Sequence, residues 1–219
     1  MVTEDRIVDC HAHIIDPVRF PFTGTKGYRA RADEHGTREE FCAVLGEHGV
    51  RNAVLIQLSG YGTDNSANLD AIKAYPGRFK AIAGVEPDAS DKTLEDLAAA
   101  GVVGARFNLV SYDPGALSRA DAPRLLQRME ALGWFAQVYA DDAQWPAAAA
   151  TLRTSGIRVL VDHFGVRGCI WGSDWPFINV PMRPTYADVL APLSRWLPDS
   201  ADRACVLSHN PRRLFGFGG

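Results

Sequence analysis

Short apolar runs rich in β-branched residues alternate along the chain with longer segments whose apolar residues recur at helical spacing. The runs predict strands at residues 6–14, 52–58, 80–85, 102–109, 134–140, 158–163 and 169–173. The longer segments predict helices at residues 37–48, 66–75, 93–100, 122–132 and 143–155. Near-continuous apolar strands that alternate with helices are typical of a parallel sheet covered by helices. Strands in one such series, with no linker between them, favour a single α/β domain over residues 1–219, folded as a (β/α) barrel.

The composition indicates a globular chain, for which an enzyme is the working interpretation. A hydrophobic content of 47%, a charged content of 22% and a net charge of −3 exclude a disordered chain. A pI near 6.1 gives no basic surface for nucleic acid, and no apolar run reaches the roughly 18 residues of a membrane-spanning helix. The charged N-terminus and the four scattered cysteines favour a reduced, cytoplasmic protein. No glycine-rich nucleotide motif follows a predicted strand.

Polar side chains stand at the C-terminal ends of the predicted strands, where (β/α) barrels carry their chemistry. They are Asp9, His11, His13, Gln57, Ser59, Arg106, Asn108, Gln137, Tyr139, Asp162, His163, Ser173 and Asp174. Because side chains alternate along a strand, His11 and His13 should both face the inside of the barrel. Cys10 has the opposite parity, so we expect it to face the helices as a small core residue and not to act as a nucleophile.

The His11-x-His13 pair has two interpretations. Its rings could converge on a metal ion or a carbonyl oxygen, or they could form a buried pair without chemistry. The presence of His163 and Asp174 at other strand ends favours chemistry. Asp174 stands between two tryptophans in WGSDWP, so we expect a largely buried carboxylate whose pKa is raised by burial and lowered again by the histidines. Such a group would act as a general base, whereas the alternative is a simple helix cap.

Arg106 lies within a predicted strand, in the sequence GARFNL. A buried guanidinium without an anionic partner is unfavourable. The partner could be the carboxylate of a substrate, which matches the guanidinium in a bidentate way, or an aspartate of the barrel in a structural salt bridge.

Six motifs together resemble the amidohydrolase-related family, and within it the branch of 2-pyrone-4,6-dicarboxylate lactonase-like hydrolases. They are DCHAHI, GYGTDN, GARFNL, VDHFG, WGSDWPF and NPRRLFGF, in family order over nearly the whole chain. The resemblance implies an eight-stranded TIM barrel of the metal-dependent-hydrolase type. It also implies that Asp174 activates the attacking water while His11, His13 and His163 polarise the scissile carbonyl. The residues it assigns to the substrate pocket are Arg106, Tyr139, Tyr28 and Ser59.

The residues at the ends of the predicted strands also indicate which metal cofactor the site could hold. Binuclear amidohydrolases use a carboxylated lysine on strand four and a histidine on strand five, where this chain carries Arg106 and Tyr139. The remaining donors, His11, His13, His163 and Asp174, could hold a single zinc or manganese ion. The lactonase branch is thought to work without metal, so we favour a reaction without a cofactor and keep one divalent metal as the alternative.

These residues predict hydrolysis of a lactone or ester that carries a carboxylate. One alternative is a mononuclear metal-dependent amidohydrolase or decarboxylase of the same superfamily. The other is a barrel that binds a carboxylated ligand without turning it over. The expected partner is a small carboxylated molecule, with no nucleic acid and no membrane, and an oligomer is compatible with the sequence.

One strand unit is missing from the series. Only Gly165 to Gly168 separate the VDHFG motif from the strand that leads into WGSDWP, whereas parallel neighbours need a crossover of about a dozen residues. A complete barrel has about 250 residues, and the family pattern places a helix, a seventh strand with a second substrate-binding arginine, and another helix here. Either the chain has lost this unit, or residues between Gly165 and Cys169 are missing from the sequence. We favour the second, with WGSDWP in the last of eight strands.

Overall fold

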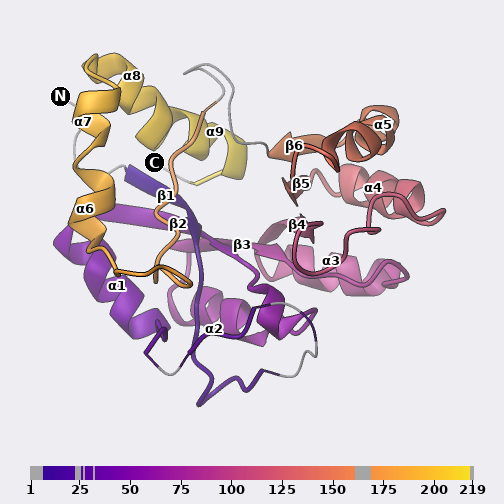
Figure 1. The fold of residues 1–219 in the computed structure, drawn as a ribbon, viewed down its shortest axis with the longest axis horizontal. Coiled ribbons are helices and arrows are strands. Elements are labelled where there is room, and N and C mark those ends of the chain that lie inside the picture. Colours follow the sequence, from indigo (N-terminus) through magenta and orange to yellow (C-terminus); the bar gives the residue numbers. More distant parts are fainter. Residues whose placement is uncertain (1–6, 23–25, 27, 32, 161–168, 218–219) are drawn as a thin grey trace.

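A computed structural model describes residues 7–22, 26, 28–31, 33–160 and 169–217 of the chain. Its centre is a parallel sheet in the order β1-β2-β3-β4-β5-β6, which is also the order along the sequence. The strands are β1 (Ile7–Ala12), β2 (Val50–Ile56), β3 (Phe79–Ala83), β4 (Val102–Asn108), β5 (Phe135–Tyr139) and β6 (Arg158–Leu160). Figure 1 shows this sheet curling, with the helices that connect its strands along one side.

A helix follows each of the first five strands. These are α1 (Arg38–Glu47), α2 (Ser66–Ala74), α3 (Asp91–Ala99), α4 (Ala122–Ala131) and α5 (Trp145–Ser155), with a short 3₁₀ turn, η2 (Ser59–Tyr61), ahead of α2. The C-terminal part holds α6 (Tyr186–Leu190), α7 (Leu193–Trp196), α8 (Ser200–Ala204), the π-helical turn η3 (Cys205–His209) and α9 (Asn210–Phe215). Thr37 starts α1 with a capping box, and the Ser90 side chain caps α3. The predicted helices and the first six predicted strands are confirmed, with shifts at their ends. The seventh predicted strand is wrong, because residues 169–173 form no strand in the structure. None of the helices in the described residues is long and apolar enough to cross a membrane.

Two apolar clusters lie on the two faces of the sheet. The larger joins the strands to α1–α5 through residues such as Phe41, Leu94 and Met129. The smaller contains residues of β1, β2, β3 and β5, and the C-terminal Phe215 and Phe217 pack into it. Cys10 is buried in this second cluster, so the prediction of a small core residue is confirmed, whereas the prediction that it faces the helices that connect the strands is wrong. The pairing of β1 with β2 shifts register between Asp9 and Ala12, and this irregularity breaks the alternation on which the prediction rested.

The segment 171–175 runs beside β1, on the side away from β2. The Cys10 amide donates to the Trp171 carbonyl at 2.8 Å, and the His13 amide donates to the Trp175 carbonyl at 2.8 Å. Ala12 and Trp175 form a parallel bridge. In a closed barrel the last strand pairs with the first, so WGSDWP occupies the last-strand position, as predicted. No strand among the described residues lies between β6 and this segment, and the expected break between Gly165 and Cys169 falls on residues outside the described ranges.

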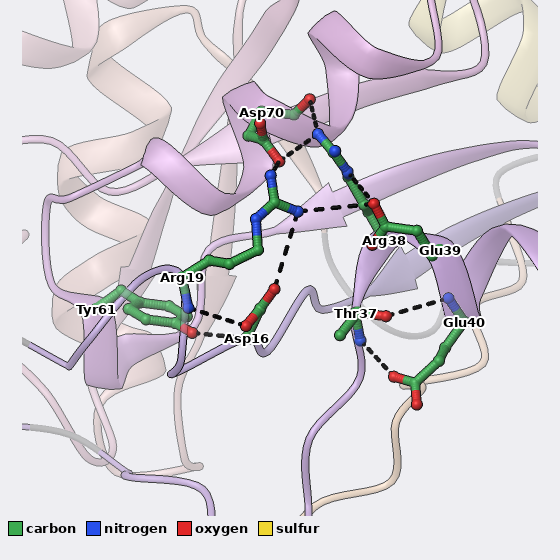
Figure 2. Close-up of polar contacts among 8 residues, drawn as sticks. All are labelled: Asp16, Arg19, Thr37, Arg38, Glu39, Glu40, Tyr61 and Asp70. Atoms are coloured by element: carbon green, nitrogen blue, oxygen red, sulfur yellow. Dashed lines mark hydrogen bonds and ion pairs between the residues drawn. The ribbon is translucent and has the colours of Figure 1, made fainter.

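An ion-pair network fastens the loop after β1 to the helices beside it (Figure 2). Arg19 contacts Asp70 of α2 at 3.0 Å, and Arg38 of α1 contacts the same carboxylate at 2.5 Å. The Arg19 amide donates to Asp16 at 3.1 Å, and the Asp16 amide donates to the Tyr61 hydroxyl at 3.1 Å. Tyr61 is buried, so this network holds one wall of the cavity described below.

Candidate active site

His11 and His13 meet at the C-terminal end of β1. Their ring centroids are 5.2 Å apart and the ring planes are nearly perpendicular, at 84°. His13 is 3% exposed, and its Nδ1 lies 2.7 Å from the carbonyl oxygen of Ile56. Since a carbonyl oxygen can only accept, Nδ1 must carry the proton. This contact leaves Nε2 of a neutral His13 facing the site as an acceptor or a metal ligand.

Asp174 faces both rings from the neighbouring segment. Its Oδ1 lies 3.3 Å from Nε2 of His13 and 3.6 Å from Nε2 of His11. Its amide donates to the His11 carbonyl at 2.7 Å, and its φ of 61° is in the left-handed region that non-glycine residues rarely adopt. The structure thus brings together the three residues that the sequence placed on the first and last strands.

The Asp174 carboxylate is exposed, with 64% of its side-chain surface accessible, so the prediction of a largely buried group is wrong. Partial burial raises its pKa, but the contact with His13 and the electrostatic interactions with His13, His11 and Arg106 lower it by more. The net result is a pKa below the ordinary value, contrary to the rise that we expected from the flanking tryptophans. Asp174 is therefore ionised at neutral pH and able to accept a proton.

His11 is held in its neutral form. Burial lowers its pKa, as do the charges of His13 and Arg106, and the opposing charge of Asp174 leaves the value at about 3. A neutral imidazole beside a carboxylate can offer one N–H to a substrate oxygen or a lone pair to a metal. Its ring is 32% exposed, so it is accessible from outside.

Arg106 enters the site from β4 without an anionic partner among the described residues. Its Nε and Nη1 atoms are buried and make no hydrogen bond within this part of the chain. Burial lowers the pKa of Arg106 to about 10, against the opposing charges of Asp174 and Tyr139. The alternative of a structural salt bridge to a barrel aspartate therefore finds no support in the described contacts. Tyr139 ends β5 beside Asn108 of β4 and is 47% exposed.

A cavity of about 950 Å³ opens next to Arg106, lined by the loops after β2, β3 and β4. The amide of Gln57 shapes one wall by donating to the carbonyls of Gly62 and Asp64, at 3.1 and 2.8 Å. A Cβ on Gly84 would lie 2.3 Å from the Gly62 carbonyl oxygen, so only glycine fits there. Gln57 thus supports a wall, a role that its position at a strand end did not reveal.

Three other predicted site residues have different outcomes. The Ser59 hydroxyl accepts the Tyr28 amide at 3.4 Å, and Ser59 and Arg106 line the same small cavity. The Tyr28 hydroxyl donates to the Glu34 carboxylate, which also accepts the Asn179 amide at 2.8 Å. Tyr28 is therefore tied to Glu34, a buried residue for which the sequence carried no signal. His163 lies outside the described residues.

The donor set fits one metal ion. One ligand atom from each of His11, His13 and Asp174 lies within 4.8 Å of the others. The Ile56 carbonyl fixes the His13 tautomer so that Nε2 is left as the ligand atom, as it does in metal-binding histidines. Two imidazoles and one carboxylate suit a divalent zinc or manganese ion. Among the described residues, strands four and five offer neither the lysine nor the histidine that a second ion would need.

Comparison with known proteins identifies the family to which this chain belongs. The family model described as "Amidohydrolase" matches residues 8–167 and 141–217. The 4-sulfomuconolactone hydrolase of Hydrogenophaga intermedia is 24% identical over 269 aligned positions, covering 95% of this chain and 88% of that protein. The 2-pyrone-4,6-dicarboxylate hydrolase of Comamonas testosteroni is 29% identical over 72% of this chain and 51% of its own.

Solved structures show the same architecture. A probable 2-pyrone-4,6-dicarboxylic acid hydrolase from Acinetobacter baumannii, with citric acid bound, has a TM-score of 0.81 and 26% identity, covering 97% of this chain and all of its own. A zinc-bound amidohydrolase from Burkholderia multivorans has a TM-score of 0.70 at 15% identity over 97% of this chain and 100% of its own. At that identity the second match shows the fold alone.

The length of one alignment can be compared with the length of this chain. The Hydrogenophaga match spans 269 positions but only 95% of the 219 residues here, so about 60 positions of that relative face no residue of this chain. About 60 residues is the size of two strand–helix units. A missing unit between Gly165 and Cys169 stays a prediction.

Proposed function

The chain belongs to the amidohydrolase family, and from that premise we propose that it hydrolyses a lactone or activated ester that carries a carboxylate. The observation that carries the proposal is the approach of the Asp174 carboxylate to His13 and His11, at 3.3 and 3.6 Å, beside a buried arginine with unpaired donors. The lactone hydrolases among the relatives support the same class of substrate.

Asp174 is the group that activates water. Because its pKa is lowered, it is ionised at neutral pH and accepts one proton as the water oxygen bonds to the carbonyl carbon. An N–H group of neutral His11 stabilises the oxyanion of the tetrahedral intermediate, and His13, whose N–H is bonded to the Ile56 carbonyl, presents Nε2 to the site as an acceptor. When the intermediate collapses, the ring C–O bond breaks, and the proton held by Asp174 passes to the departing oxygen.

Arg106 binds the substrate carboxylate. Its Nε and Nη1 atoms are buried donors without a partner in the described part of the chain, and the planar fork of a guanidinium matches the two oxygens of a carboxylate. Binding this anion would relieve the unfavourable burial of the charge and would hold the ring carbonyl against Asp174. Ser59 and Tyr139 would complete the wall around the same substrate.

A metal-dependent reaction of the same superfamily is the second candidate, and the convergence of three ligand atoms within 4.8 Å favours it. A bound divalent ion would polarise the carbonyl and lower the pKa of a coordinated water. His11, His13 and Asp174 would hold the ion, and Arg106 would still orient the substrate. The match to a 2,6-dihydroxybenzoate decarboxylase, at 13% identity, concerns the fold alone. The third reading, a barrel that only binds carboxylates, predicts binding without turnover.

A panel of carboxylated lactones, esters and benzoates, assayed for ring opening and for CO₂ release, tests the proposal. We expect ring opening by the purified chain, its loss in Asp174→Asn, and no loss after dialysis against a chelator. Loss of activity on chelation, with recovery on adding zinc or manganese, would favour the metal-dependent alternative. Ligand binding that is unchanged in Asp174→Asn, with no turnover by either protein, would favour the binding barrel.

A further inference from the structure

Asp9 is a buried carboxylate, two residues before His11, that takes no direct part in the proposed reaction. Its side chain is 0% exposed. Oδ1 accepts the His11 amide at 3.2 Å and the Ser173 amide at 2.9 Å, while Oδ2 accepts the Ser173 hydroxyl at 2.5 Å and the Tyr186 hydroxyl at 2.8 Å. Four donors satisfy the two oxygens of this fully buried carboxylate, so Asp9 joins four groups from three parts of the chain.

The hydrogen-bond donors to Asp9 come from different parts of the chain, and Asp9 connects these parts. The His11 amide belongs to β1 at the point where its pairing with β2 shifts register. Ser173 belongs to the neighbouring segment and directly precedes Asp174, and its hydroxyl also accepts the Trp175 amide at 3.0 Å. The same carboxylate therefore fixes the backbone at one histidine and on both sides of the proposed general base.

The conformation of Asp174 needs such a support. A φ of 61° is unfavourable for a residue with a side chain, and it persists only where surrounding contacts hold it. The Asp174 amide donates to the His11 carbonyl. On one side of Asp174, the Ser173 amide donates to Asp9, and on the other side the Trp175 amide donates to the Ser173 hydroxyl, which is itself bonded to Asp9. Backbone contacts at both flanks set the direction in which the Asp174 carboxylate points.

We propose that Asp9 is a positioning residue, which, through Ser173 and the His11 amide, sets the Asp174 carboxylate against the rings of His11 and His13. The proposal rests on the proposed function, since it concerns the geometry of the same site. Tyr186 completes the arrangement from α6 by donating to Asp9 without touching Asp174. Burial raises the pKa of Asp9, and the hydrogen bonds from Ser173, Tyr186 and His11 oppose the rise.

The test uses Ser173→Ala and Tyr186→Phe, each of which removes one hydroxyl donor from Asp9 and leaves the reacting groups intact. Misplacement by about 1 Å can reduce a rate by about 10²-fold, so we expect kcat to fall by about 10- to 100-fold in Ser173→Ala and by less in Tyr186→Phe. KM should stay within about threefold, because Arg106 is untouched. The matched control is Ser208→Ala, since Ser208 is a buried serine whose hydroxyl has no hydrogen-bond partner in the described part of the chain.

Two results would overturn the proposal. One is a kcat within about twofold of wild type in both variants while each is folded, which is what a merely structural carboxylate predicts. The other comes from crystal structures, where we expect the distance from Asp174 Oδ1 to His13 Nε2 to lengthen by about 1 Å in Ser173→Ala, and where an unchanged distance contradicts the role. The structural readout needs no substrate, so a wild-type chain that opens no lactone would overturn the proposed function and leave this inference to be decided by the distance.

Discussion

Replacing Arg106 by methionine should make the chain more stable and less able to bind its substrate. The change keeps a long apolar stem and removes a guanidinium whose Nε and Nη1 atoms have no partner in the described residues. Burial holds the pKa of Arg106 at about 10 instead of 12.5, which corresponds to about 3 kcal/mol of lost interaction for the charged form. This value already includes the opposing charges of Asp174 and Tyr139. Replacing a buried charge by an apolar side chain of similar volume is typically neutral or stabilising, so we expect the free energy of unfolding to rise by about 1–3 kcal/mol.

Urea unfolding of wild type, Arg106→Met and Arg153→Met measures this effect. Arg153 is an exposed arginine on α5, and its replacement should change stability by less than about 0.5 kcal/mol. Malonate, as a small carboxylate probe, should raise the Tm of wild type and of Arg153→Met but not that of Arg106→Met, because a ligand stabilises only the state that binds it.

The reasoning would be refuted if Arg106→Met lowered the free energy of unfolding by about 2 kcal/mol or more, because Arg106 would then have a structural partner. It would equally be refuted if malonate stabilised Arg106→Met as strongly as wild type. In the lactone assay the same variant should raise KM by about 10²-fold or more, as expected for the loss of two charge-assisted hydrogen bonds.

Three further predictions concern the base, its pH dependence and the loop that carries Tyr28. Asp174→Asn should lower kcat by about 10²- to 10⁴-fold in steady-state assays with little change in unfolding free energy, and a smaller loss would assign the base elsewhere. The pKa of Asp174 is lowered and that of His11 is about 3, so kcat/KM should stay constant from pH 7 to about pH 5 and fall below about pH 4. A decrease of kcat/KM that is already half complete near pH 6 would contradict this expectation. Glu34 has a folded pKa of about 2 against an ordinary 4.5, so its stabilisation is full above about pH 4.5 and disappears toward pH 2. Glu34→Gln should therefore destabilise the chain by about 1–3 kcal/mol at pH 7 and by nothing near pH 2 in urea titrations.

The alternation of apolar and polar residues was enough to predict the first six strands, the helices that connect them and the end of the sheet that holds the site. The family resemblance placed WGSDWP in the last strand, and from that placement Asp174 was expected to face His11 and His13, because the last strand of a barrel lies beside the first. The side on which Cys10 lies could not be predicted, since the register shift between Asp9 and Ala12 depends on contacts with a segment far away in the sequence.

The solvent exposure of Asp174 and the hydrogen bonds between distant parts of the chain could not be predicted from the sequence either. Trp171 and Trp175 are buried, yet they do not cover the carboxylate between them, because its backbone turns into the left-handed region. Glu34 binds the Tyr28 hydroxyl across a loop with no periodic pattern to reveal the pairing. Asp9 stood in the DCHAHI motif, but its role depends on Ser173 and Tyr186, which are more than 160 residues away along the chain.

The lowered pKa of Asp174 constrains the chemistry that this site can perform. A general base is most effective when its pKa lies near the working pH, and a carboxylate below its ordinary value is a weak base at pH 7. The rate must then come from orientation by Arg106, from stabilisation of the oxyanion and from a substrate that is already activated. An amide has a poor leaving group and would need a stronger nucleophile, whereas a lactone whose ring oxygen leaves as a stabilised enolate needs little. For the proposed reaction, the lowered pKa of Asp174 therefore favours an activated lactone over an amide as the substrate.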